Sequence, residues 1–111
     1  MKPGDIILID FPFTIPTQSK ISPAVVLTVT QDKYKDIIIC AISSVVPSTI
    51  APREIFISTG NSSFPATGLR VESIIKIDRL ATLRTTDVIM QLGYCPPNLW
   101  NEIVTKFRSL V

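Results

Sequence analysis

The chain of 111 residues suffices for one compact domain, which we expect to span residues 1–111, and is too short for two. It contains no histidine, which excludes His-ligated metal sites and the Ser-His-Asp and Cys-His nucleophile systems. The net charge of +2 is too small to indicate nucleic-acid binding by itself. The charged fraction of 18% lies below the roughly 25% of an ordinary soluble domain, so we expect an oligomer or an obligate partner to cover part of the apolar surface.

Ile, Val and Thr make up a third of the chain and predict a domain built mainly of strands. In chain order, the apolar runs predict strands at residues 5–11, 24–30, 37–43, 54–57, 73–78 and 87–94. The first and third runs are apolar on both faces and should be central strands. The second and third should pair as a hairpin, and the fourth alternates like an edge strand. The last run suits a strand or a helix, and its alternation favours a strand.

The C-terminal segment predicts one helix. Pro96 and Pro97 stop the preceding run, and Asn98 can cap a helix in which apolar residues recur at helical spacing, namely Leu99, Ile103, Phe107 and Leu110. Five to seven short strands and one terminal helix indicate a mainly β (α+β) fold, a small curled sheet or barrel with the helix packed on it.

The cysteines and the N-terminus indicate the compartment. Cys40 and Cys95 lie outside any zinc-binding spacing, and although one disulfide is possible, we expect buried free thiols in a reducing cytoplasm. Residues 1–5 lack the apolar region of a signal peptide. The longest uncharged stretch, residues 37–52, contains two prolines and falls short of the ~18 apolar residues that a spanning helix needs. We expect a soluble cytoplasmic protein with no membrane contact.

Four short pieces of the sequence occur in a recognisable order. They are Gly-Asp-Ile-Ile-Leu-Ile-Asp at 4–10, Pro-Ala-Val-Val-Leu at 23–27, Cys-Ala-Ile-Ser at 40–43 and Ser-Ile-Ile-Lys-Ile-Asp-Arg-Leu at 73–80. Together they resemble the MazF/PemK family, the ribonuclease toxins of bacterial type II toxin-antitoxin pairs, over nearly the whole chain. The resemblance implies an SH3-like barrel of the CcdB/MazF type that forms a homodimer. It also implies cleavage of single-stranded RNA without metal or other cofactor, and silencing by a cognate antitoxin.

RNA cleavage without metal uses the ribose 2′-hydroxyl as nucleophile and needs a base, an acid and cations from the protein. The resemblance places the family's strand-end hydroxyl at Ser43, its acidic residue at Asp78 and its basic residue at Lys76. We therefore expect Asp78 as the base and Lys76 as phosphate binder or acid. Their neighbours Ser44 and Arg79 are expected to bind substrate.

The chain departs from the family at one position. Most members carry an arginine immediately before the proline of the second strand, and here that residue is Ser22. Serine has neither the fixed charge nor the planar fork that suits arginine to phosphate, and Lys20 is the candidate to compensate. The alternative function is therefore a toxin-like barrel with weakened or no catalysis that binds an antitoxin or, like CcdB, gyrase. A generic SH3-like peptide binder fits poorly, because the eight aromatic residues lie mostly in apolar runs.

Purely structural roles are open for the same residues. Ser43 and Ser44 can simply end a strand through hydrogen bonds to the backbone. Asp78 can form an ordinary solvated ion pair with a neighbouring cation. Trp100 is expected to pack in the core or in a dimer interface.

Overall fold

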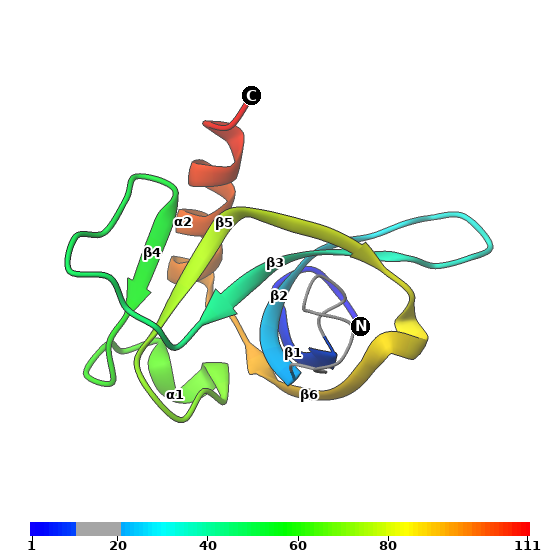
Figure 1. Ribbon diagram of the computed structural model, residues 1–111. Helices are drawn as coiled ribbons and strands as arrows, with labels where there is room; N and C mark the ends of the chain where they lie inside the picture. Colours follow the sequence, from blue (N-terminus) through cyan, green and yellow to red (C-terminus); the bar gives the residue numbers. More distant parts are fainter. Residues whose placement is uncertain (11–20) are drawn as a thin grey trace, which may run out of the picture.

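The computed structural model describes residues 1–10 and 21–111 and contains one antiparallel sheet of six strands (Figure 1). The strands lie in the order β4-β5-β3-β2-β1-β6. Their bounds are Asp5–Asp10 (β1), Ile21–Val29 (β2), Ile37–Ser43 (β3), Glu54–Ile57 (β4), Ser73–Leu83 (β5) and Val88–Tyr94 (β6). A short helix α1, Phe64–Thr67, precedes β5, a 3-10 turn η1, Thr85–Asp87, precedes β6, and the helix α2, Pro97–Arg108, follows it.

The predicted pairing is confirmed. β1 lies between β2 and β6, β3 lies between β2 and β5, β2 and β3 form a hairpin, and β4 is an edge strand. The predicted bounds of β3 and β4 are correct, whereas β2 begins three residues earlier and β5 runs five residues further than the sequence pattern indicated.

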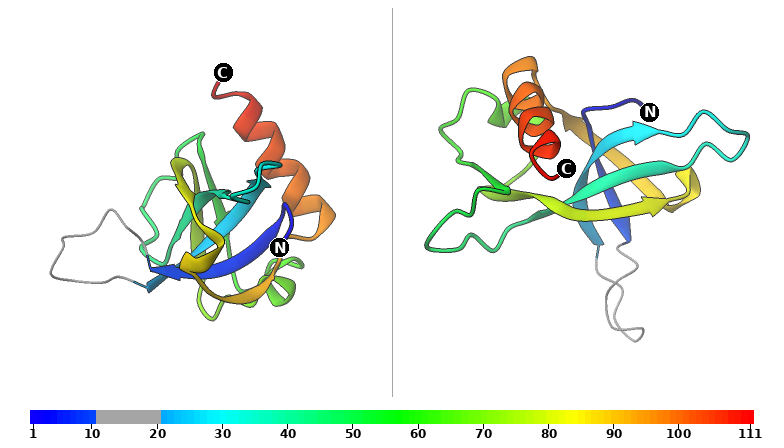
Figure 2. Two further views of the ribbon diagram at one scale, coloured as in Figure 1. Left: turned by 90° about the vertical axis from the view of Figure 1, so that its right-hand side faces the viewer. Right: turned by 90° about the horizontal axis from the view of Figure 1, so that it is seen from above.

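The sheet is strongly curled, with α2 on the outside of the curl (Figures 1 and 2). β4 and β6 remain its two edges, so within the described residues the sheet is open and not a closed ring. The mainly β fold with a C-terminal helix is confirmed, in the form of this open curled sheet.

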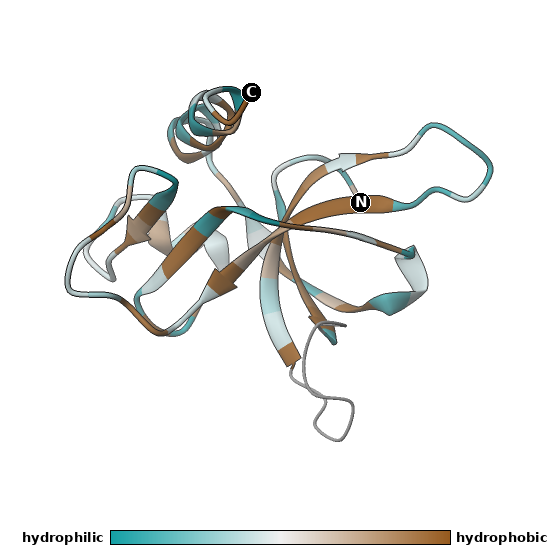
Figure 3. Ribbon diagram, turned by 45° about the horizontal axis from the view of Figure 1, so that its top comes forward, coloured by the Kyte–Doolittle hydropathy of each residue, from teal (hydrophilic) through white to brown (hydrophobic). Residues whose placement is uncertain are grey.

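Two apolar clusters hold the sheet in this shape. Inside the curl, side chains of five strands or their ends pack together, namely Ile7, Ile9, Ala24, Val26, Ile37, Ile39, Ala81 and Leu83, with Val88 beside them. On the outer face, Leu99 and Ile103 of α2 pack on Ile6, Ile75 and Ile77. Along β1, β2 and β3, alternate residues serve the two clusters, which is why these strands are apolar on both faces. Figure 3 shows the same division, with apolar residues along the strands and hydrophilic ones in the β2–β3 loop.

The start of α2 corrects one prediction. Pro96, not Asn98, is the N-cap, and its side chain makes no capping hydrogen bond. Proline suits the first helical position, where Pro97 stands, because the missing N–H would have no partner there. The helix therefore begins directly after the strand that the prolines end. Trp100 is partly buried against the outer cluster, as predicted.

Both cysteines are buried free thiols, as predicted. Burial, with a smaller contribution from the neighbouring Cys95, raises the pKa of Cys40 to about 12. Burial also raises the pKa of Cys95 to about 12, with a smaller contribution from Asp5. No helix among the described residues is both long and apolar enough to cross a membrane.

The raised pKa values predict protected thiols and a loss of stability at high pH. Both values lie above the ordinary 9.0, so the stability linked to the protonated thiols is present below pH 9 and is lost as the pH rises toward 12. At pH 8 an aromatic disulfide reagent should react slowly with the native protein and rapidly with two thiols in denaturant. Rapid reaction of either thiol in the native state would contradict the burial of both side chains.

Candidate functional site

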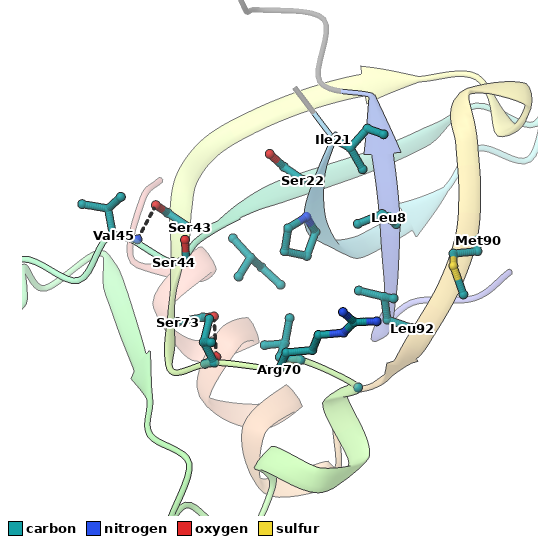
Figure 4. A pocket seen from close by; sticks show the side chains of 15 residues that line it. Leu8, Ile21, Ser22, Ser43, Ser44, Val45, Arg70, Ser73, Met90 and Leu92 are labelled. Carbon is teal, nitrogen blue, oxygen red and sulfur yellow. Dashed lines mark hydrogen bonds between the residues drawn. The ribbon is translucent and has the colours of Figure 1, made fainter. Parts of the chain in front are cut away.

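A cavity of about 500 Å³ lies where β2 begins and β3 ends (Figure 4). Ser22, Ser43 and Ser44 line one side of it. The opposite side comes from residues 68–71, which connect α1 to β5, and from Met90 and Leu92 of β6. Apolar side chains such as Leu8 and Ile42 form the floor. Hydroxyl groups thus line one side of an otherwise largely apolar hollow.

Strand register explains why the two predicted serines meet. β2 and β3 pair Ala24 with Ala41. Continuing this register by two residues places Ser22 opposite Ser43, on the same face of the sheet. Ser22, Ser43 and Ser44 therefore lie around one cavity.

The Ser43 hydroxyl has one defined structural contact. Its oxygen accepts a hydrogen bond of 3.1 Å from the backbone N–H of Val45, which turns the chain after β3. This is the strand-ending contact that the residue type indicated. Because a hydroxyl also carries one donor, the O–H of Ser43 is free to donate to a ligand oxygen.

The remaining predicted residues line a second cavity, of about 360 Å³. Lys76, Asp78 and Arg79 lie there beside Arg53 and Glu54. The Asp78 carboxylate lies 4.0 Å from the Arg53 guanidinium, with both side chains well exposed. Such a pair contributes little to stability, so neither group is committed to the fold. Lys20 lies outside the described residues.

A bulge in β5 produces this second cavity. Between Lys76 and Leu80 the strand advances four residues, while β3 advances only one, from Ala41 to Cys40. Asp78 and Arg79 therefore lie in a segment without partners on β3, and the bulge bends the strand. Lys76 and Asp78 both line this cavity, although the bulge interrupts the regular strand between them and β3.

Ser43 of the first cavity and Lys76 of the second are near neighbours on the sheet. Ser43 pairs with Ile74, and Lys76 stands two residues further along β5 on the same face. Diagonal neighbours of this kind are typically about 7–8 Å apart. This face is the one away from α2, because the alternate residues Ile42 and Ile75 pack in the outer cluster. The hydroxyl and the amine are thus near neighbours on one surface.

Sequence reasoning missed Arg70. Among the described residues that line the first cavity, it is the only one with a charged side chain. An arginine shortly after a glycine turn was visible in the sequence. The direction in which the Arg70 side chain points could not be predicted, because it depends on how the Gly68 turn packs against β6.

Two glycines fix that packing. Gly68 ends α1 in the left-handed conformation, with φ of 72°, and a Cβ there would collide with the carbonyl oxygen of Leu92. A Cβ on Gly93 would collide with the carbonyl oxygen of Ala66. The end of α1 therefore touches the backbone of β6 directly, which sets the position of the Arg70 segment.

The charges of both cavities favour an anionic ligand. The first holds Arg70 and, among its described lining residues, no carboxylate. The second holds three cations, Arg53, Lys76 and Arg79, against the carboxylates of Glu54 and Asp78. Hydroxyl donors together with an excess of cations over carboxylates suit the binding of phosphate.

An open, curled antiparallel sheet with a terminal helix, and two cavities whose charges favour an anionic ligand, together define a small β-domain with an anion-binding site. The chain belongs to the family of PemK-like, MazF-like toxins of type II toxin-antitoxin systems, whose model matches residues 2–111. A comparison with curated protein sequences gives no match.

Solved structures show the same fold. MazF from Deinococcus radiodurans is 21% identical, with a TM-score of 0.71, over 99% of this chain and 94% of that one. The MazE-MazF complex from the same organism is 20% identical, with a TM-score of 0.72 and the same coverage. An endoribonuclease bound to its cognate antitoxin, from a mycobacterial species, is 15% identical, with a TM-score of 0.67, over 98% of this chain and 92% of that one.

Proposed function

We propose that this protein is the toxin of a type II toxin-antitoxin pair and an endoribonuclease that cleaves single-stranded RNA without a metal ion. The observation that carries the proposal is the closeness of Ser43 and Lys76 on one face of the sheet, each lining a cavity with hydroxyl or cationic groups, in a chain of this toxin family. The fold is shared with an endoribonuclease and with toxins solved in complex with antitoxins.

The reaction we propose is attack of a ribose 2′-hydroxyl on the adjacent phosphorus. The new O–P bond forms a 2′,3′-cyclic phosphate, while the bond to the 5′-oxygen of the next nucleotide breaks. Asp78 takes the proton of the 2′-hydroxyl, and Lys76 protonates the leaving oxygen or neutralises the phosphorane charge. Ser43 donates its O–H to a non-bridging oxygen. We propose that four further residues bind the flanking RNA, namely Lys20, Ser22, Ser44 and Arg79, of which Lys20 lies outside the described residues.

Partners of this function are an antitoxin and a second copy of the chain. The large apolar side chains of Leu80, Ile89 and Met90 are 41–52% exposed, and we propose that contacts with another chain cover them. We propose that the homodimer acts in the cytoplasm, where its RNA substrate and its antitoxin are made.

A second candidate function is binding without catalysis, to an antitoxin or, in the manner of CcdB, to gyrase. The observation that favours it is Ser22, which is 9% exposed and places an uncharged hydroxyl at the start of β2. Cleavage assays decide between the two functions.

The proposed function is tested by incubating the purified chain with mixed-sequence single-stranded RNA in excess EDTA. A DNA strand of the same sequence is the matched control, since it lacks the 2′-hydroxyl. We expect specific cleavage of the RNA and an intact DNA strand. RNA left intact, while an active toxin of the same family cleaves it in parallel, would favour the binding function instead.

Asp78→Asn should slow RNA cleavage by about 10²–10⁴-fold if this carboxylate is the general base. The substitution preserves the size of the side chain and removes its proton affinity, and the salt bridge that it loses is exposed. The matched control is Glu72→Gln, which changes an exposed carboxylate outside both cavities. Single-turnover rates compare the variants, and equal rates for Asp78→Asn and the parent would exclude Asp78 as the base.

A further inference from the structure

Arg70 occupies a distinctive place in the first cavity. Its side chain extends from the α1–β5 segment toward Leu8 and Leu92, across the cavity from Ser22 and Ser43 (Figure 4). Its guanidinium therefore faces a hollow whose other polar groups are neutral hydroxyls.

The guanidinium is not used to hold the fold together. Within the described part of the chain Arg70 has no ion pair and no side-chain hydrogen bond, whereas Arg53 pairs with Asp78 and Lys106 donates to the carbonyl of Pro52. Its five N–H donors are thus available to a ligand.

The segment that carries Arg70 is nevertheless fixed at both ends. On one side Gly68 packs against Leu92, and the Thr67 hydroxyl accepts the N–H of Leu69 at 3.2 Å. On the other side the Ser73 hydroxyl donates to the carbonyl of Val71 at 2.9 Å. The backbone on both sides of Arg70 is therefore held before any ligand arrives, which lowers the entropic cost of binding.

The composition of the cavity favours one kind of ligand. A guanidinium fork binds phosphate through two parallel hydrogen bonds. The apolar floor beside it, formed by Leu8, Ile42 and Leu92, suits the face of an unstacked base. A volume of about 500 Å³ is within the range of small-molecule sites.

We infer that Arg70 binds a backbone phosphate of single-stranded RNA in this cavity and positions the strand beside Ser43. This inference rests on the proposed function and adds a substrate-positioning residue to it. Arg70 acts through phosphate contact, so its contribution is electrostatic and nearly independent of base sequence.

The test measures binding of a fluorescent single-stranded RNA whose 2′-hydroxyls are all methylated, so that it cannot be cleaved. Arg70→Gln should weaken binding at least tenfold and lower the slope of log Kd against log salt by about 0.7, the loss of one phosphate contact. Arg70→Lys should bind the RNA with an affinity between those of the parent and Arg70→Gln, because lysine keeps the positive charge but lacks the planar guanidinium. Arg108→Gln, an exposed arginine on α2 outside the cavity, is the matched control and should bind like the parent.

The outcomes separate this inference from the proposed function. If the parent cleaves RNA but Arg70→Gln binds the methylated strand with the parent's affinity and salt slope, the inference is overturned and the cavity belongs to a protein partner. If the parent cleaves nothing yet Arg70→Gln shows the predicted loss of binding, the inference holds and the ribonuclease function fails. Equal melting temperatures of the variants establish that folding is unchanged.

Discussion

Replacing Gly68 with alanine is expected to lower the free energy of unfolding by about 2–5 kcal/mol. Two costs combine at this position. The residue has a φ of 72°, which an L side chain rarely adopts, and the added methyl group would collide with the carbonyl oxygen of Leu92. Backbone cannot yield as a flexible side chain can, so α1 must separate from β6. Urea unfolding measures the change.

Gly60→Ala provides the matched control for this prediction. A Cβ at Gly60 has nothing within 4 Å, and no positive φ is needed there. We expect its stability to stay within about 0.5 kcal/mol of the parent. If Gly68→Ala were as stable as Gly60→Ala, this result would contradict the close contact between α1 and β6. The placement of Arg70 would then lose its structural basis.

Ser43→Ala is expected to reduce the single-turnover rate of RNA cleavage by about 10²–10³-fold, the usual loss when one donor to transition-state charge is removed. The hydroxyl oxygen accepts the Val45 N–H, and its own O–H is the donor that we propose for the RNA. The change should appear in the rate at saturating RNA, because the donor acts on charge that develops during the reaction.

Ser43→Thr is the control that keeps the hydroxyl at the same strand end. It should retain cleavage within about tenfold of the parent, since threonine makes the same backbone turn and the same donation. An Ala variant as active as the Thr variant would show that Ser43 only ends β3. Thermal melts of both variants separate a catalytic loss from a loss of folded protein.

The strands were predictable where the sequence pattern has clear ends. β3 ends at Ser43 before a loop rich in Ser and Pro, and β4 is a short alternating run between two turns, so both bounds were correct. The helix α1 was not predicted, because four residues give no periodicity and its ends depend on Pro65 and Gly68. The start of α2 was misplaced because a side-chain cap was expected where the chain uses two prolines.

The candidate site was predictable only in part. The ordered family pieces pointed to Ser43 and Lys76, and strand register explains why the two lie close together. The bulge after Lys76 could not be foreseen, because it lies where β5 stops pairing with β4 and shifts its register on β3. Arg70 was missed for the same kind of reason, since only the contact of Gly68 with β6 turns its segment toward the serines.

The chemical identity of the cleaved RNA ends tests the proposed mechanism most directly. A short single-stranded RNA is incubated with the protein in EDTA, and the masses of the fragments are measured by mass spectrometry. Attack by the 2′-hydroxyl leaves a 2′,3′-cyclic phosphate on one fragment and a free 5′-hydroxyl on the other. Fragments that carry a 3′-hydroxyl and a 5′-phosphate would show that water attacks the phosphorus and that the bond to the 3′-oxygen breaks. This result would contradict the proposed roles of Ser43, Lys76 and Asp78.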